Sequence, residues 1–344
     1  MNEPLPVMKL TPKEFATDQD VRWCPGCGDY AILKAVQKSL AEAGAEPHNT
    51  VFVSGIGCSS RFPYYMETYG FHTIHGRAPA VATGVKIANP DLDVWIVTGD
   101  GDGMSIGGNH LFHILRRNVD VQLLLFNNEI YGLTKGQFSP TSRVGTRSPT
   151  SPGGSIDAPV NPCVFALGCG ARFVARSADT LQKHMPDILK RARDNKGASF
   201  VEILQNCIIY NDAVFDDVTN KKTRDDHTVL VEHGQPMIYG KEVKRGIRLR
   251  PGKLELEVVT LGEDGITEAD LLVHDETNPV LANMLSHMGG DGFPTALGVL
   301  YCDPTPAFDQ EVTARREALP KREGDARSQI EKLVYAGRVW TVPE

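Results

Sequence analysis

The chain has 344 residues, of which 41% are hydrophobic and 7% aromatic, and this composition excludes a disordered or fibrous protein. Its formal net charge of -7, without a long basic block, argues against a nucleic-acid-binding surface. Residues 1–20 lack an apolar core and no long apolar run occurs elsewhere, so we expect a cytoplasmic protein without a membrane span. In that compartment the 7 unevenly spaced cysteines favour thiols or metal ligands over disulfides.

Alternating helix and strand signals run from about residue 30 to residue 207. In chain order, the predicted elements are a helix over 31–43, a strand over 51–53, a helix within 72–86, a strand over 94–98, a helix over 106–115, a strand over 121–127, a strand over 170–175, a helix over 178–195 and a strand over 198–204. This pattern predicts a doubly wound α/β fold with a mostly parallel sheet. The Ser-, Thr-, Pro- and Gly-rich stretch 140–162 is a long irregular loop of the kind that is often functional.

The composition changes after about residue 213. A charged connector over 216–226 is followed by a hairpin, whose strands flank Pro251-Gly252, and by a short helix over 278–288. We therefore predict a domain over 1–213 that carries the chemistry. Residues 214–344 are predicted to be an appended C-terminal segment that covers a cofactor or a partner interface.

A glycine and aspartate cluster comes directly after the predicted strand at 94–98, with the sequence Gly99-Asp100-Gly101-Asp102-Gly103. Asn128 follows the next predicted strand. Glycines allow the backbone to approach a diphosphate closely, and carboxylate and amide oxygens are ligands that suit Mg²⁺. The pattern therefore indicates a magnesium-diphosphate site, although the cluster taken alone would fit a turn or a helix cap equally well.

Two of the cysteines form a Cys-x-x-Cys pair within the sequence Trp23-Cys24-Pro25-Gly26-Cys27-Gly28. This tight turn exposes backbone amides that can hydrogen-bond to coordinated sulfur. The pair alone fits a zinc knuckle, a redox dithiol or a corner of an iron–sulfur site. Without a second such pair, a closed zinc site is the stronger alternative.

Cys58 and Cys207 each follow a predicted strand, as the glycine and aspartate cluster does. Ligands of open parallel sheets bind at the carboxyl edge, so these two thiols are expected at the same edge as the diphosphate site. Together with Cys24 and Cys27, they could hold one 4Fe-4S cluster. The remaining cysteines are expected to be ordinary buried or half-buried thiols: Cys163, Cys169 and Cys302.

Several motifs occur in one order along the chain: WCPGCG, GIGCSSR, HGRAPAVATGVK, GDGDGMSIGGNHL, NNEIYGLTKGQ and a later NC. In this combination, over about residues 15–215, the chain resembles the β subunit of 2-oxoacid:ferredoxin oxidoreductases, most closely that of the 2-oxoglutarate enzymes. The resemblance implies an α/β fold of the thiamine-diphosphate-binding type. It adds the identity of the organic cofactor, which the glycine spacing does not reveal.

The resemblance also implies which residues hold the cofactors. It places Mg²⁺ on Asp100, Asn128 and the backbone carbonyl of Ile130, and a single 4Fe-4S cluster on the four cysteines named above. The residues that it implies around thiamine diphosphate are Gly57, Ser59, His75, Gly99, Asp100, Gly101, Asp102, Gly103, Asn128, Ile130, Gly132, Leu133 and Thr134.

The implied reaction is that of 2-oxoglutarate synthase. It decarboxylates 2-oxoglutarate oxidatively to succinyl-CoA and CO₂, uses coenzyme A as co-substrate, and passes two electrons singly through the cluster to ferredoxin. The family can also run the reaction backwards to fix CO₂. The protein contributes placement and electrostatics, while the cofactor stabilises the carbanion. Pyruvate and branched-chain 2-oxoacids remain alternatives, because the motifs do not separate these substrates.

Three further residues are candidates for catalysis or substrate binding. His75 could bind the diphosphate or the substrate carboxylate, with a structural helix cap as the alternative. Arg61 and Lys135 are cations beside the expected site, and a dianionic substrate would need such partners; solvated surface charge is the alternative for both. Asp102 could brace the loop without binding any ligand.

The resemblance implies partners as well. No glutamate suited to activating the thiamine ring stands out here, and in the resembled family the partner subunit supplies that function. We therefore expect an α subunit to complete the active site across an apolar interface, in a dimer of heterodimers, with ferredoxin as electron acceptor. The alternative from another class is a zinc-stabilised, non-catalytic nucleotide-binding module, in which the Cys-x-x-Cys pair is structural.

Overall fold

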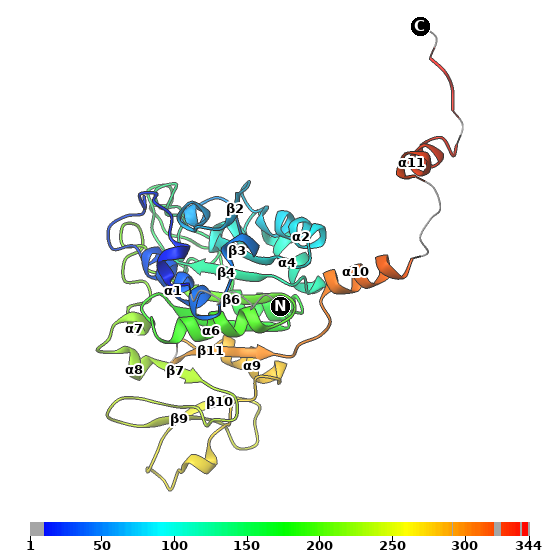
Figure 1. Ribbon diagram of the computed structural model, residues 1–344. Helices are drawn as coiled ribbons and strands as arrows, with labels where there is room; N and C mark the ends of the chain where they lie inside the picture. The colour runs from blue at the N-terminus through cyan, green and yellow to red at the C-terminus, as the bar shows by residue number, and fades with distance from the viewer. Residues whose placement is uncertain (1–9, 291, 320–324, 338, 343–344) are drawn as a thin grey trace, which may run out of the picture.

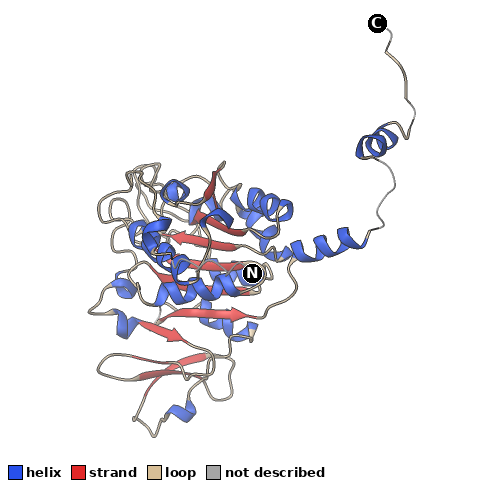
Figure 2. Cartoon of the chain, viewed as in Figure 1, coloured by secondary structure: helices blue, strands red, loops and turns tan. Residues whose placement is uncertain are grey.

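The computed structural model describes residues 10–290, 292–319, 325–337 and 339–342, so the first part of the N-terminal segment discussed above, residues 1–9, lies outside it. An eight-stranded sheet with helices on both faces forms the body of the molecule (Figures 1 and 2). Its strands are, in chain order, β1 Thr50–Ser54, β2 Tyr69–His72, β3 Asp93–Gly99, β4 Gln122–Asn127, β5 Phe173–Ala178, β6 Ser199–Leu204, β7 Thr228–Val231 and β11 Thr295–Cys302.

The order of the strands across the sheet is β2-β1-β3-β4-β6-β5-β11-β7. The six strands from β2 to β5 pair in parallel, which requires a crossover after each strand and confirms the predicted doubly wound α/β fold. Strand β11 runs antiparallel to β5, and β7 pairs in parallel with β11. The sheet is therefore mostly parallel, and the two strands at one end, β11 and β7, run opposite to the other six.

Helices cover both faces of the sheet. The α-helices are α1 Asp29–Glu42, α2 Ala78–Ala88, α3 Asp100–Met104, α4 Gly108–Arg117, α5 Pro162–Gly168, α6 His184–Asp194, α7 Asp216–Thr219, α8 Arg224–His227, α9 Pro279–Ser286, α10 Phe308–Ala318 and α11 Ala326–Val334. The 3-10 helices are η1 Pro12–Phe15, η2 Pro47–Asn49, η3 Ser59–Tyr65 and η4 Glu268–Asp270. Among the described residues, no helix is both long enough and apolar enough to span a bilayer.

Two apolar cores form because successive strand residues point to opposite faces of the sheet. In β3, Trp95 and Val97 pack in the core beneath α1 and α6, whereas Val94 and Ile96 pack in the core beneath α2 and α4. All four side chains are at most 1% exposed. Burial on both faces explains why the strand sequences are nearly continuous apolar runs.

The C-terminal region contributes to two sheets. Strands β7 and β11 extend the main sheet, and β8 Ile238–Tyr239, β9 Arg245–Leu249 and β10 Leu256–Thr260 form a small antiparallel sheet. The β9–β10 pair confirms the predicted hairpin, and α9 confirms the helix predicted over 278–288. Helices α10 and α11 extend away from the body (Figure 1). The domain division after residue 213 stays a prediction.

Two predicted helices begin elsewhere than expected. Strand β5 continues to Ala178, which pairs with Leu204 of β6, so α6 begins only at His184. The glycine and aspartate cluster is itself helical, because α3 begins directly at Asp100, and the predicted helix over 106–115 is observed as α4, starting at Gly108. The first turn of α3 therefore lies at the carboxyl end of β3.

A buried ion pair connects the neighbouring strands β5 and β6. Arg176 Nε lies 2.6 Å from Glu202 Oε2, with side-chain exposures of 6% and 2%, and Asn127 Nδ2 donates to Glu202 Oε1 at 2.8 Å. We expect Glu202→Ala to lower the free energy of unfolding by about 3–5 kcal/mol, because it leaves the guanidinium charge buried without its carboxylate. The control is Glu242→Ala at an exposed position, expected within about 0.5 kcal/mol of wild type. Equal denaturant midpoints for the two variants would contradict this assignment.

Candidate functional site

Four loops that carry the predicted site residues leave the sheet at one edge, because β1, β3, β4 and β6 are parallel neighbours. These loops carry Cys58, Asp100, Asn128 and Cys207. The loops after β1, β3 and β4 line a cavity of about 120 Å³, and Cys207 lies behind its lining residue Gly132. The structure thus brings together residues far apart in the sequence, as the strand pattern predicts.

The lining of this cavity includes most residues expected around thiamine diphosphate: Gly57, Ser59, His75, Gly99, Asp100, Gly101, Asp102, Asn128, Ile130, Gly132, Leu133 and Thr134. Gly103 lies behind the lining, where an added Cβ would contact Thr98 and Leu125. Two buried atoms of lining residues, Ser59 Oγ and Asp29 Oδ2, lack a hydrogen-bond partner within the described structure. Buried polar atoms normally have partners, so the cavity fits a polar occupant.

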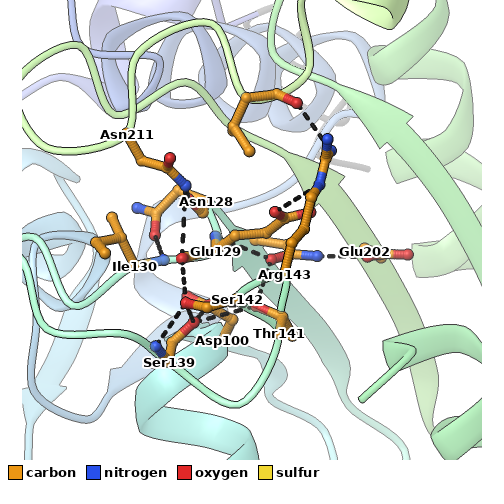
Figure 3. Close-up of polar contacts among 12 residues, drawn as sticks. Asp100, Asn128, Glu129, Ile130, Ser139, Thr141, Ser142, Arg143, Glu202 and Asn211 are labelled. Atoms are coloured by element: carbon orange, nitrogen blue, oxygen red, sulfur yellow. Dashed lines mark hydrogen bonds and ion pairs between the residues drawn. The ribbon is translucent and has the colours of Figure 1, made fainter. Parts of the chain in front are cut away.

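Asp100 is 2% exposed, and its carboxylate is held by two hydroxyl groups at the start of the long loop after β4 (Figure 3). Ser139 Oγ and Thr141 Oγ1 both donate to Asp100 Oδ2, the latter at 2.6 Å. Burial raises the pKa of Asp100 to about 6, and these hydroxyl donors oppose the rise. A buried carboxylate that is costly to ionise is stabilised by a cation, which fits the expected magnesium ligand.

Asn128 is oriented by partners on both ends of its amide. Its Nδ2 donates to Gln205 Oε1 at 2.7 Å, and its Oδ1 accepts from the backbone N–H of Ile130 at 3.2 Å. Between these two residues, Glu129 has a φ of 54°, a left-handed conformation uncommon for a residue with a side chain. Ser142 Oγ donates to the Glu129 carbonyl and stabilises this turn (Figure 3).

The three donors that the resemblance implies for magnesium all offer hard oxygen atoms: the Asp100 carboxylate, the Asn128 amide and the Ile130 carbonyl. Mg²⁺ commonly takes one or two protein carboxylates and completes its octahedron with phosphate oxygens and water. Within the described residues, no three His, Cys, Asp or Glu side chains converge closely enough to hold an ion by themselves. The chemistry of the donor set fits a magnesium ion that a diphosphate helps to bind.

Asp102 braces three segments around the cavity. Its carboxylate accepts from the backbone N–H groups of Ile56 at 3.0 Å and Gly76 at 2.7 Å, and from Thr98 Oγ1 at 2.6 Å. It also accepts from His75 Nδ1 at 2.5 Å. The ring of His75, which lines the cavity, is therefore held by Asp102, and this contact leaves Nε2 as the ring atom available to a ligand. Ligand binding by either residue stays a prediction.

The glycine at position 101 is required by a neighbouring ring. A Cβ on Gly101 would overlap the Tyr131 side chain, whose hydroxyl donates to the Gly101 carbonyl at 3.0 Å. The sequence pattern indicated that the glycines allow a diphosphate to approach the backbone closely. In the structure, close packing between α3 and the loop after β4 also requires glycine here.

Of the candidate cluster cysteines, Cys58 and Cys207 lie at or beside the cavity. Cys58 lines the cavity, and a Cβ on Gly132 would lie 3.3 Å from Cys207 Sγ and 3.7 Å from Cys58 Sγ. Glycine at this position therefore keeps the space between these two sulfurs open. On the opposite side, Gln205 Nε2 donates to Cys27 Sγ at 3.3 Å.

The pKa values of two of these thiols are raised by burial and by the charges around them. Burial, followed by the charge of Asp29, raises the pKa of Cys27 far above its usual value, and Cys58 and Cys207 add to the rise. Burial and Asp29 also raise the pKa of Cys58 to about 12, with contributions from Cys207 and Cys24. Three half-buried thiols, those of Cys27, Cys58 and Cys207, together with the exposed Cys24, fit the ligand set of a 4Fe-4S cluster, whose metal charge would favour the thiolates.

The two predicted cations lie outside the cavity lining. Arg61, in η3, is half-buried and close enough to Cys58 to oppose the rise of that thiol's pKa. Lys135 is exposed, with a φ of 75°, one residue beyond the lining residue Thr134. Both positions allow contact with a substrate that enters from outside, and substrate binding by either stays a prediction.

The structure adds site residues that the sequence did not single out. Asp29 is 1% exposed, and burial raises its pKa to about 7. Gln205 is 1% exposed and contacts both Asn128 and Cys27. Ser139 and Thr141 hold Asp100. Only Asp29 had a local signal, as the residue directly after the Cys-x-x-Cys-Gly motif; the others come together through the fold.

The long irregular loop predicted over 140–162 contributes directly to the site. Arg143 Nε lies 3.0 Å from Glu129 Oε2 (Figure 3). Its Nη2 donates to the Val214 carbonyl at 2.8 Å. The side chain thus joins the turn beside Asn128 to the start of the C-terminal segment. The loop therefore fixes both the turn and the neighbouring Asp100.

Residues 55–203 match the family model described as "Thiamine pyrophosphate enzyme, C-terminal TPP binding domain". The match includes the loops after β3 and β4 that carry the oxygen donors. The chain is also 46% identical over 342 residues to the Mycobacterium tuberculosis protein named 2-oxoglutarate oxidoreductase subunit KorB, with 96% of this chain and 88% of that relative covered. The chain belongs to the family of 2-oxoglutarate:ferredoxin oxidoreductase β subunits.

A further relative and a solved structure are also similar to this chain. An Aeropyrum pernix protein named 2-oxoacid:ferredoxin oxidoreductase 1, subunit beta, is 49% identical over 190 residues, covering 55% of this chain and 60% of that relative. A solved 2-oxoglutarate:ferredoxin oxidoreductase from Magnetococcus marinus, described with 2-oxoglutarate, coenzyme A and succinyl-CoA bound, matches with a TM-score of 0.76 and 33% identity. That match covers 95% of this chain and 96% of the solved chain.

Membership confirms the resemblance that the motifs indicated, the thiamine-diphosphate-type fold and the class of oxidoreductase. The name of a β subunit implies a partner subunit. The chain is therefore one subunit of an oxidoreductase of the 2-oxoglutarate type, with a thiamine-diphosphate-binding domain.

Proposed function

We propose that this β subunit catalyses, together with an α subunit, the reversible oxidative decarboxylation of 2-oxoglutarate to succinyl-CoA and CO₂. Coenzyme A is the acyl acceptor, and ferredoxin takes two electrons one at a time. The observation that carries the proposal is the position of Cys58, which lines the diphosphate-sized cavity and lies across Gly132 from Cys207. A cluster on these thiols would adjoin the thiamine cofactor directly.

Each resident cofactor has a set of residues that fits it. Asp100, Asn128 and the Ile130 carbonyl would hold Mg²⁺, and a 4Fe-4S cluster would be held by Cys24, Cys27, Cys58 and Cys207. When bound, thiamine diphosphate supplies the electron sink for decarboxylation and the cluster supplies one-electron transfer. The lining glycines and Ser59 would surround the diphosphate.

The chain's own side chains orient and bind in this scheme. Asp102 holds the His75 ring, and with both ring nitrogens protonated Nε2 would donate a hydrogen bond to an oxygen of the diphosphate or of the substrate carboxylate. Arg61 and Lys135 would attract a dianionic substrate toward the cavity mouth. Ser139 and Thr141 hold the Asp100 carboxylate in place before the metal binds.

An apolar rim around the cavity supports the need for the α subunit. The cavity itself, about 120 Å³, is smaller than the roughly 300–1,000 Å³ of typical cofactor-sized pockets, so further walls must come from elsewhere. Large apolar side chains that are 37–73% exposed lie on or beside its lining and on the edge strand β2: Ile56, Tyr69, Phe71, Ile74, Ile106 and Leu133. Such a patch beside a functional cavity is typical of a protein interface.

The substrate and the subunit requirement are tested together by reconstitution. The chain alone is expected to show no 2-oxoglutarate-dependent ferredoxin reduction, and addition of the α subunit is expected to restore it. Initial rates of the complex on 2-oxoglutarate, pyruvate and 2-oxoisovalerate then identify the substrate, with 2-oxoglutarate expected to be fastest. Full activity of the chain alone, or a clear preference for pyruvate, would contradict the proposal.

The rim is tested by a charge at its most exposed position. Ile74→Asp is expected to weaken association with the α subunit by at least about tenfold, because a buried interface charge costs more than 1.4 kcal/mol. Ile156→Asp is the matched control, since Ile156 is 90% exposed and lies outside the rim. Both affinities can be measured by interferometry with immobilised α subunit. Equal affinities for the two variants would remove this face as the interface.

A further inference from the structure

A single buried amide, that of Gln205, contacts both proposed cofactor sites. Gln205 follows β6 directly and is 1% exposed, and its backbone N–H donates to the Asn127 carbonyl at 2.8 Å. Its Nε2 donates to Cys27 Sγ at 3.3 Å, and its Oε1 accepts from Asn128 Nδ2 at 2.7 Å. One side chain thus joins a cluster ligand to a magnesium ligand.

The direction of this amide is fixed by its neighbours. Gln205 Nε2 also donates to the Asn206 carbonyl at 2.7 Å. The opposite amide orientation would place the Gln205 oxygen against that carbonyl and its nitrogen against the Asn128 Nδ2 donor, so two hydrogen bonds would be lost. The N–H group therefore points at the Cys27 sulfur, and the oxygen points at the amide nitrogen of Asn128.

We propose, on the basis of the proposed function, that Gln205 is a positioning residue that prepares both cofactor sites. By accepting from Asn128 Nδ2, it turns the Asn128 oxygen toward the side where the Ile130 backbone and the cavity lie. By donating to Cys27 Sγ, it stabilises the extra negative charge of the reduced cluster, since hydrogen bonds to cluster sulfurs shift the reduction potential.

Two variants separate the two contacts. Gln205→Leu removes both the donor and the acceptor. Gln205→Glu removes the donor to Cys27 and adds negative charge, but keeps an oxygen that can accept from Asn128. Both variants should therefore lower the midpoint potential of the cluster, while only the leucine should weaken binding of the metal. Gln182→Leu is the matched control, because Gln182 is exposed and donates only to the carbonyls of Ala31 and Asp179.

The measurements use the full αβ complex purified without oxygen. An EPR-monitored redox titration is expected to show the reduction equilibrium shifted about tenfold toward the oxidised cluster in both Gln205 variants, equivalent to about 59 mV for one electron. Mn²⁺ EPR in the presence of thiamine diphosphate is expected to show about tenfold weaker metal binding for Gln205→Leu, within the range for partners of metal ligands. Gln205→Glu should bind Mn²⁺ as tightly as wild type or more tightly, and Gln182→Leu should match wild type in both measurements.

A spectroscopic measurement keeps the inference testable if a variant does not fold. In wild-type complex labelled with side-chain ¹⁵N-glutamine, pulsed EPR of the reduced cluster should show a ¹⁵N coupling that is absent in Gln205→Glu. No such coupling, or a Gln205→Leu complex with wild-type potential and metal affinity, would overturn the inference while leaving the proposed function intact. Wild-type complex that holds neither cluster nor metal would instead overturn the proposed function.

Discussion

Replacing Cys58 with serine is expected to reduce 2-oxoglutarate-dependent ferredoxin reduction by at least about 100-fold. Loss of a residue that only hydrogen-bonds to a metal ligand already costs about 10–100-fold in metal affinity or activity, and Cys58 would be a ligand itself. Cys58 lines the cavity proposed for the diphosphate and lies beside Cys207 across Gly132, so its sulfur is at the junction of the two proposed sites. Trp23 Nε1 donates to the Cys58 carbonyl at 2.7 Å and holds the turn in place. The same variant should lose most of its iron and its brown colour.

The control for this substitution is Cys302→Ser. Cys302 is half-buried in β11, away from the cavity, and should keep wild-type iron content and rate. Wild-type chain is expected to contain about four iron and four sulfide per chain. A colourless preparation with stoichiometric zinc would favour the zinc-stabilised module instead, and about eight iron would contradict a single cluster.

Replacing Asp100 with asparagine is expected to weaken thiamine diphosphate and magnesium binding by at least about 100-fold. A proposed metal ligand should contribute at least as much as a residue that only hydrogen-bonds to a ligand, whose loss costs about 10–100-fold. The substitution keeps the size of the side chain but removes the charge that the ion requires. Isothermal calorimetry with thiamine diphosphate and Mg²⁺ measures the loss. Unchanged affinity would show that Asp100 does not hold the metal.

The same variant has an opposite effect on the free protein. Burial raises the pKa of Asp100 to about 6, so the folded state disfavours the charged form. The favourable contribution of the protonated group is therefore present at low pH and is lost as pH rises through about 6. Without cofactors, Asp100→Asn should thus be at least as stable as wild type above pH 6, by thermal melting. The exposed Asp91→Asn is the control and should not change the melting temperature. Lower stability of Asp100→Asn at pH 7.5 would contradict the electrostatic account.

The sequence was sufficient to predict the edge of the sheet that carries the site. The runs at 94–98 and 121–127 are observed as β3 and β4, and the parallel pairing of these strands places Asp100 and Asn128 together. Strand periodicity and burial on both faces are local signals, so the sequence contains them. The hairpin around Pro251-Gly252 was predictable for the same reason.

The supporting residues were not predictable, because they meet only through the fold. Thr141 reaches Asp100 from 41 residues away, and Gln205 reaches Cys27 from 178 residues away. In the sequence, no pattern distinguishes a glutamine that becomes buried after a strand from any other residue at the end of a strand. Asp29 could have been noticed as the residue after Cys-x-x-Cys-Gly, but its burial against the cavity depends on packing with the sheet.

The C-terminal region shows a similar limit. Its hairpin and short helix were predicted, but the antiparallel entry of β11 beside β5 was not. Strand β11 is an apolar run like those of the parallel sheet, and periodicity does not specify direction or neighbours. The contact from Arg143 to the Val214 carbonyl connects this region to the loop that holds Asp100. That residues 214–344 cover the cluster or the partner interface stays a prediction.

We propose that the thiamine site and the iron–sulfur site act as one redox unit at this edge of the sheet. The most direct measurement mixes the anaerobic αβ complex with 2-oxoglutarate in the absence of ferredoxin and follows the cluster by EPR. The account predicts a reduced-cluster signal that requires both 2-oxoglutarate and thiamine diphosphate and is absent in Cys58→Ser. A cluster that stays oxidised while 2-oxoglutarate is decarboxylated would contradict it.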